Sequence, residues 1–175
     1  MNANLCIRDL GDSERESLGR LMVEAYAGLE DFPGPDDQPQ YYAMLANIWQ
    51  FTARKDARVL VAVTEANEIV GGVVYFGDMT EYSSGGTAPQ VRHASGIRLL
   101  AVDPRFRGSG TGRALTQACI DLAQAKGHAR VVLHTTAAMK VARGMYERLG
   151  FERAPDLDFM QEELPVFGFM LALPK

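Results

Sequence analysis

A glycine-rich segment past the middle of the chain, residues 99–115, constrains the fold more than any other stretch. It reads LLAVDPRFRGSGTGRAL, so an apolar run ends at a proline, a basic turn follows, and glycines alternate with small polar residues. Glycines at alternate positions remove every second Cβ, which lets the backbone bend tightly and approach a ligand closely. Because an amphipathic pattern follows, we expect unpaired main-chain N–H groups at a helix N-terminus. This is typical of a strand–turn–helix unit that binds a phosphate or pyrophosphate.

Other interpretations of this segment can be tested on spacing. A phosphate-binding P-loop ends in Gly-Lys-Ser or Gly-Lys-Thr, whereas Gly112 is followed by Arg113 and Ala114. A dinucleotide-binding fingerprint has its first glycine directly after the strand, whereas residues 103–107 intervene here. The segment therefore fits both motifs poorly. Two alternatives stay open: a nucleotide-binding protein of another class, and a plain helix cap in which the glycines only allow a tight turn.

The periodicity of apolar residues predicts the order of helices and strands. Strands are expected over residues 5–10, 58–65, 69–76, 97–102, 130–135, 151–153 and 166–173. Helices are expected over residues 13–29, 40–55 and 138–149, and from the glycine-rich turn to residue 126. Polar loops are expected over residues 31–39, 78–95 and 156–163. Since strand, turn, helix and strand follow one another, strands 97–102 and 130–135 should be parallel.

Composition favours one globular domain and excludes several classes of protein. The chain has 175 residues, of which 47% are hydrophobic and 23% charged, enough for one sizeable core. A net charge of −4 argues against nucleic-acid binding, and no run approaches the roughly 20 apolar residues of a membrane span. Cys6 and Cys119 show neither a disulfide framework nor metal-ligand spacing. Without a signal-peptide pattern we expect a cytoplasmic protein with no nucleic-acid or membrane partner; a homodimer stays open.

Two short motifs, separated by a predicted helix and strand, carry a family resemblance. Within residues 102–115, Arg107, Gly110 and Gly112 stand at the fixed places of an Arg/Gln-x-x-Gly-x-Gly/Ala motif. Residues 142–151 read ARGMYERLGF, with a Tyr-Glu-x-Leu-Gly-Phe ending. The first resembles the acyl-CoA-binding motif, and the second the later helix, of the GCN5-related N-acetyltransferase (GNAT) superfamily. The resemblance implies a single α/β domain with a mixed, mostly antiparallel twisted sheet, a splayed parallel strand pair and flanking helices, over the whole chain.

The resemblance also implies transfer of an acetyl group from acetyl-CoA to a primary amine, without a metal. The main chain of the central strand would pair with the pantetheine arm, and the glycine-rich turn would bind the pyrophosphate. The residues implied are Leu100, Ala101, Val102, Arg107, Gly108, Ser109, Gly110, Thr111, Gly112 and Arg113. Relatives commonly have an asparagine seven residues before their catalytic tyrosine. Met139 stands there in this chain, so one polar contact to the cofactor would be lost or replaced.

Tyr146 matches the tyrosine to which the family usually gives the role of general acid. A tyrosine with a pKa near 10 stays protonated at neutral pH and can donate a proton to a departing thiolate. The alternative interpretation is a core aromatic residue whose hydroxyl is hydrogen-bonded within the protein.

The general base, which would take a proton from the attacking amine, is harder to place. Protein-directed relatives often have a glutamate at the position that falls on Gly96, and others have acids or histidines near Arg98. Neither residue can act as a base. His93 and Glu81, in the polar stretch 78–95, are the candidates, directly or through water. The missing acids also motivate another hypothesis, a non-catalytic acyl-CoA-binding or regulatory domain.

Several side chains bear on the acceptor, which we expect to be a small-molecule amine; a protein or peptide N-acetyltransferase is the alternative. Arg98 either faces the cleft and pairs with a substrate carboxylate or is a solvated strand charge. His134, on a predicted buried strand, is interpreted as a hydrogen-bonded core histidine. In the resembled family the first two helices wall the acceptor site, so Tyr41, Tyr42 and Trp49 either contact substrate or pack in the core.

Overall fold

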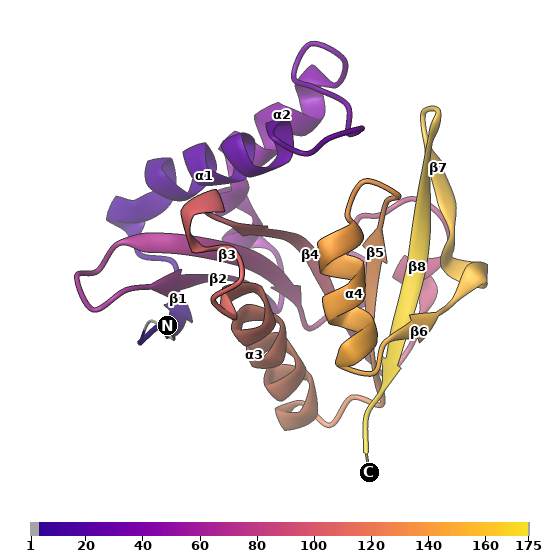
Figure 1. Cartoon of the computed structure of the whole chain (residues 1–175). Helices are drawn as coiled ribbons and strands as arrows, with labels where there is room; N and C mark the ends of the chain where they lie inside the picture. Colours follow the sequence, from indigo (N-terminus) through magenta and orange to yellow (C-terminus); the bar gives the residue numbers. More distant parts are fainter. Residues whose placement is uncertain (1–3, 175) are drawn as a thin grey trace.

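One twisted β-sheet runs through the molecule, and helices cover both of its faces (Figure 1). The computed structural model describes residues 4–174. The strands are β1 (Cys6–Asp9), β2 (Ala57–Val63), β3 (Ile69–Phe76), β4 (Ala94–Val102), β5 (Arg130–Thr135), β6 (Glu152–Arg153), β7 (Phe159–Gln161) and β8 (Leu164–Ala172). Their order across the sheet is β1-β2-β3-β4-β5-β8-β6, and β7 pairs with β8 outside this path. Among the described residues, β4 and β5 form the only parallel pair.

In the described chain, two α-helices lie on each face of the sheet. They are α1 (Arg15–Ala27), α2 (Pro39–Ala46), α3 (Thr111–Ala125) and α4 (Lys140–Arg148). Short 3₁₀ helices are η1 (Asp12–Glu14), η2 (Ile48–Ala53), η3 (Met79–Glu81), η4 (Ala88–Gln90), η5 (Pro104–Phe106) and η6 (Pro155–Leu157). Helices α1 and α2 cover one face, and α3 and α4 cover the other (Figure 1). Within residues 4–174, no helix has the length and apolar character that a membrane crossing requires.

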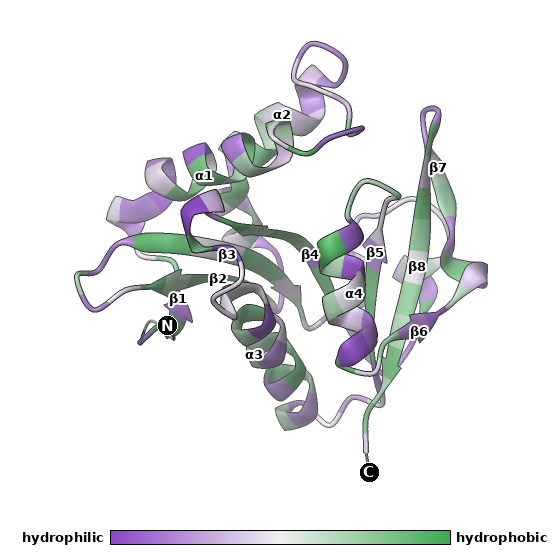
Figure 2. Ribbon diagram, viewed as in Figure 1, coloured by the Kyte–Doolittle hydropathy of each residue, from purple (hydrophilic) through white to green (hydrophobic). Residues whose placement is uncertain are grey.

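The strands carry a core on each face, because successive residues of a strand point to opposite sides. In β2, Val59, Val61 and Val63 belong to the core under α1 and α2, whereas Leu60 and Ala62 belong to the core under α3 and α4. Figure 2 shows the consequence: the central strands are apolar along most of their length, whereas the helices carry polar residues as well. Burial on both faces explains why β2 and β3 read as nearly continuous apolar runs.

Strands β4 and β5 separate part-way along their length. Their parallel pairing runs from Ala94 opposite Arg130 to Ile97 opposite Leu133 and ends there, although β4 continues to Val102. The later main-chain groups of β4 therefore have no partner strand on the β5 side. This is the splayed parallel pair that the sequence predicts, and Figure 1 shows the two strands diverging beside α4.

A bulge in β4 marks the point of separation. The register between β3 and β4 slips by one residue, so that Val73 faces both Leu99 and Leu100. Leu99 has a φ of 62°, a left-handed conformation that leucine rarely adopts. Leu99 packs in the core under α1 and α2, whereas Leu100 packs against the opposite core. Arg98, whose guanidinium faces the Phe51 ring of η2, thus shares a face with its neighbour Leu99.

The fold class and the parallel pair are confirmed, and three local predictions are wrong. The helix predicted over residues 40–55 breaks at Asn47 into α2 and η2. The Asn47 side chain donates a hydrogen bond to the Ala43 carbonyl at 2.8 Å, which competes with helical main-chain bonding. The predicted loop 78–95 contains η3, η4 and the first residues of β4. The predicted loop 156–163 contains η6 and β7, because this segment pairs with β8.

Candidate active site

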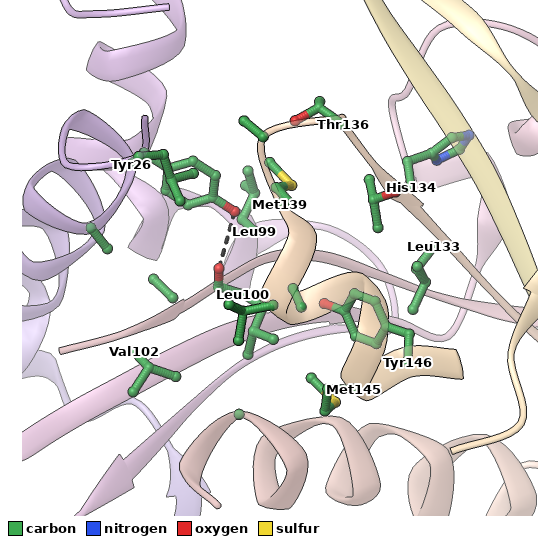
Figure 3. Close-up of a pocket in the computed structure, with 18 of the residues that line it drawn as sticks. Tyr26, Leu99, Leu100, Val102, Leu133, His134, Thr136, Met139, Met145 and Tyr146 are labelled. Carbon is green, nitrogen blue, oxygen red and sulfur yellow. Dashed lines mark hydrogen bonds between the residues drawn. The ribbon is translucent and has the colours of Figure 1, made fainter. Parts of the chain in front are cut away.

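A cavity of about 890 Å³ lies where β4 and β5 separate (Figure 3). We call the part formed by residues 107–113 the turn end, and the part formed around Tyr26, Tyr41, Tyr82 and Arg98 the aromatic end. Of the residues that the sequence predicts to bind the cofactor, the cavity wall includes Leu100, Ala101, Val102, Arg107, Gly108, Gly110, Thr111, Gly112, Arg113, Met139 and Tyr146. The structure therefore brings both family motifs to one cavity.

The glycine-rich turn has the backbone that the sequence predicts. Gly108 and Gly110 have φ values of 81° and 84°, a left-handed conformation that favours glycine, and Gly110 is the residue that precedes α3. A Cβ added at either position would have no heavy atom within 4 Å. The space over this turn is open, and the first N–H groups of a fifteen-residue helix lie beside it. The turn thus fits a diphosphate.

The arginines around the turn fall into two groups. Arg105 is engaged with acids, because its Nη2 lies 2.8 Å from Asp103 and 2.7 Å from Glu68. Arg107 and Arg113 line the cavity, and neither has a carboxylate within 4.0 Å among residues 4–174. Their charge is therefore available to an anion at the turn end. Ser109 lies behind the cavity wall, with its Oγ 2.9 Å from the Thr111 hydroxyl.

The edge of β4 faces the cavity with little of its polar main chain engaged. The Tyr26 hydroxyl of α1 donates a hydrogen bond to the Leu100 carbonyl at 3.1 Å, the dashed contact in Figure 3. Burial raises the pKa of Tyr26 well above its ordinary value, so this hydroxyl stays a donor at neutral pH. The contact ties α1 to β4 three residues beyond the last residue that pairs with β5.

Tyr146 brings its hydroxyl into the cavity from α4. The side chain is only 5% exposed, and Figure 3 shows its oxygen directed toward the side where Leu100 lies. In the described part of the chain this oxygen has no hydrogen-bond partner, which disfavours a purely structural role. Burial raises the pKa of Tyr146, so the phenol keeps its proton beyond the range of an exposed tyrosine.

Two threonines that sequence reasoning missed line the same cavity. Thr135 and Thr136, at the end of β5, are 1% and 6% exposed. Within residues 4–174, neither hydroxyl has a hydrogen-bond partner. A buried hydroxyl without a partner is costly, so these oxygens fit a ligand that supplies polar groups. The one feature of the sequence that points to these threonines is their position. They stand at the carboxyl end of β5, the strand predicted to run parallel to β4.

His134 is the hydrogen-bonded core histidine that the sequence suggests, and it also lines the cavity. Its Nε2 donates to the Leu157 carbonyl at 2.9 Å, since a carbonyl can only accept. Its Nδ1 lies 2.9 Å from the Tyr82 hydroxyl, and in the neutral ring this nitrogen accepts a hydrogen bond from that hydroxyl. Burial lowers the pKa of His134, so the neutral ring is favoured at neutral pH.

The candidate bases lie outside the cavity wall. His93 is exposed at the other end of β4, with a φ of 55°. Glu81 ends η3, where its main-chain carbonyl accepts from Arg54 at 2.9 Å. At Gly96, the position to which the family resemblance assigns the glutamate of protein-directed relatives, an added Cβ would lie 2.6 Å from the Tyr82 ring. The ring of Tyr82 therefore occupies the space that such a glutamate would need.

Comparison with known proteins agrees with this geometry. Residues 22–151 match the family model described as acetyltransferase (GNAT) family. N-acetylaspartate synthetase of Danio rerio is 39% identical over 62 residues, 35% of this chain and 22% of that protein. Mycothiol acetyltransferase of Kocuria rhizophila is 46% identical over 57 residues, 33% of this chain and 19% of that protein. The matches thus span less than a quarter of these relatives.

Solved structures with the same fold superpose on nearly the whole length of this chain. The PaiA N-acetyltransferase of Thermoplasma acidophilum, solved in complex with coenzyme A, superposes with a TM-score of 0.74 at 13% identity. The superposition covers 97% of this chain and 99% of that one. The family model covers most of the sequence, including both motifs and the strands that separate. The chain belongs to the acetyltransferase (GNAT) family.

Proposed function

We propose that the protein transfers an acetyl group from acetyl-CoA to a primary amine of a small molecule. One observation carries the proposal: an open, arginine-flanked glycine turn shares one cavity with the hydroxyl of Tyr146, which has no hydrogen-bond partner among residues 4–174. The turn suits the diphosphate of a CoA thioester, and the hydroxyl suits the sulfur that leaves. Names of relatives such as N-acetylaspartate synthetase and mycothiol acetyltransferase support a small acceptor.

The residues at the turn end would hold acetyl-CoA mainly through the main chain. N–H groups of residues 107–112, with the charges of Arg107 and Arg113, would bind the diphosphate. The free edge of β4 at residues 100–102 would pair with the amides of the pantetheine arm, and the hydroxyls of Thr135 and Thr136 would add polar contacts. Met139 packs against the core on the α1–α2 face and supplies no hydrogen-bond donor there.

Acetyl-CoA supplies the acetyl group as a thioester. The amine nitrogen attacks the carbonyl carbon, so a C–N bond forms, the C–S bond breaks, and the nitrogen gives up a proton. Main-chain N–H groups of β4 stabilise the charge that develops on the carbonyl oxygen. Tyr146 donates its proton to the departing sulfur and recovers one from solvent. Because Glu81 and His93 lie outside the cavity wall, water in the cavity takes the proton from the amine.

Turnover against a panel of amines tests the proposal. The purified protein is mixed with acetyl-CoA and with small amines, amino acids or peptides that have a free N-terminus, and release of free thiol is followed. We expect thiol release that saturates with at least one small amine and needs the amine. Saturable binding of CoA without turnover of any amine would favour the non-catalytic acyl-CoA-binding domain, which the blocked position at Gly96 motivates. Turnover of peptides alone would overturn the small-molecule acceptor.

A further inference from the structure

We infer that Arg98 binds a carboxylate of the acceptor, so that the acceptor is an amino acid or another amine with a carboxylate near its amino group. The inference rests on the proposed function, since it concerns the acceptor side of the same cavity. The inferred carboxylate site gives a role to the aromatic end of the cavity, which is not proposed to bind acetyl-CoA.

The bulge in β4 places Arg98 on the acceptor side. Leu100 and Val102 flank Gly112 at the start of α3, and both lie on the α3 face of the sheet. Arg98 lies on the opposite face, where its guanidinium carbon is 5.9 Å from the centre of the Phe51 ring and 5.8 Å from that of Tyr82. The gap between the separated strands joins the two faces. A thioester that enters from the turn end therefore meets an acceptor held on the Arg98 side.

The guanidinium of Arg98 is half-buried and, among the described residues, forms one hydrogen bond. Its Nη1 donates to the main-chain carbonyl of Tyr82 at 2.9 Å, which fixes the orientation of the group. Among residues 4–174, no carboxylate lies within 4.0 Å of it. The acids that line the cavity, Glu30 and Asp31, are exposed on the α1–α2 loop. The Nε–Nη2 edge, the pair of donors that matches a carboxylate, is therefore free.

The surroundings make an anion partner favourable. Tyr26, Phe32 and Tyr41 line the cavity beside Arg98 and form one aromatic cluster, with ring centroids 5.7 to 6.0 Å apart. Aromatic walls lower the local dielectric, so a partly desolvated cation without an anion is unfavourable and a carboxylate opposite it is attracted strongly. By contrast, the arginines on the outer surface, such as Arg58 and Arg153, already pair with aspartates.

Matched acceptors test the inference. Common L-amino acids and their carboxamides, which keep the amine and lose the carboxylate charge, are compared as acceptors by kcat and KM. For the wild-type protein we expect kcat/KM for the best amino acid to exceed that of its carboxamide by about 100-fold. Arg98→Gln should bring the ratio of kcat/KM between amino acid and carboxamide close to one, mainly through a higher KM for the amino acid. Arg98→Lys, which keeps the charge, should restore part of it. Arg20→Gln is the matched control, because Arg20 is an exposed residue of α1.

Binding provides a measurement without turnover. With CoA bound, N-acetyl-amino acids and their carboxamides are titrated by calorimetry against wild type and Arg98→Gln. We expect the carboxylate compounds to bind wild type more tightly, and the difference to vanish in the variant while CoA affinity is unchanged. Equal use and equal binding of carboxylate and carboxamide by wild type would overturn the inference while leaving acetyl transfer intact. Selective carboxylate binding without turnover would sink the proposed function and keep the Arg98 site.

Discussion

The two ends of the cavity are built in different ways. The turn end consists of one continuous segment, residues 107–113, and offers main-chain N–H groups shaped by left-handed glycines. The aromatic end consists of side chains from α1, α2, the segment after η3 and β4, which are distant in sequence. Tyr82 shows the difference, since its hydroxyl reaches both the Ile97 carbonyl and His134 while its ring covers Gly96.

The two ends of the cavity therefore respond differently to substitution. A main-chain site needs particular φ angles and open space, so one added Cβ damages it locally. A side-chain site needs rings packed on one another, so damage there spreads into the core. Tyr146 lines the same cavity, and the chemistry is proposed to occur at its hydroxyl. The expected effects of substitution therefore differ in kind, on turnover, on stability and on ligand affinity.

The largest expected effect is on turnover, when Tyr146 is substituted. Tyr146→Phe removes the proton that we propose the sulfur receives, so kcat should fall about 100-fold or more. The dissociation constant for CoA should stay unchanged, because the ring remains in place. Tyr75→Phe is the matched control, since Tyr75 is equally buried but its hydroxyl contacts Ser95 outside the cavity. An unchanged kcat in Tyr146→Phe would refute the acid role.

The next effect is on stability, at the aromatic end. Gly96→Ala places a Cβ 2.6 Å from Cδ2 and 2.8 Å from Cε2 of the Tyr82 ring. Overpacking of this kind lowers the free energy of unfolding by about 1–3 kcal/mol, measured by denaturant unfolding. Gly34→Ala is the control, because the nearest atom would lie at an ordinary 3.8 Å. Equal stability of the two variants would show that Tyr82 does not hold this end together.

A smaller effect is expected on ligand affinity, at the turn end. Gly110→Val adds bulk where the diphosphate is proposed to approach, so the dissociation constant for CoA should rise about 10-fold, measured by calorimetry. Gly127→Val is a close control. Gly127 also has a positive φ, 77°, and open space around it, but it ends α3 away from the cavity. Both variants bear similar backbone strain, so an equal loss of CoA affinity in both would contradict a diphosphate site at Gly110.

The smallest effect is a pH dependence at the aromatic end. Burial lowers the pKa of His134 below its ordinary value of 6.5, so the folded protein binds this proton less readily than the unfolded chain. As the pH falls below 6.5, the free energy of unfolding should decrease by at most about 1.4 kcal/mol per pH unit from this group. His134→Gln should show a shallower decrease than wild type in acid unfolding curves. Identical curves for the variant and wild type would remove His134 as the cause.

Sequence patterns predicted the elements that depend on local signals. The alternate glycines, the strand before them and the helix after them all appear where expected, because each follows from the residues of its own segment. The break of the predicted helix 40–55 into two pieces was not predictable from the sequence. It depends on a single hydrogen bond, from the Asn47 side chain to the Ala43 carbonyl, which affects only one helical turn. β7 was not predictable either, because a three-residue strand forms only where β8 offers an edge.

The sequence by itself determined the family, the glycine-rich turn and the order of strands and helices. These depend on spacing within short segments, which periodicity and backbone preference reveal directly. Only the tertiary structure decided that Tyr82 covers Gly96. It also decided that, in the described part of the chain, Thr135 and Thr136 lack hydrogen-bond partners and Arg98 faces the cavity with no carboxylate within 4.0 Å. The physical reason is that a bulge of one residue reverses which face a side chain occupies, and the partners it then meets come from segments far away in the chain.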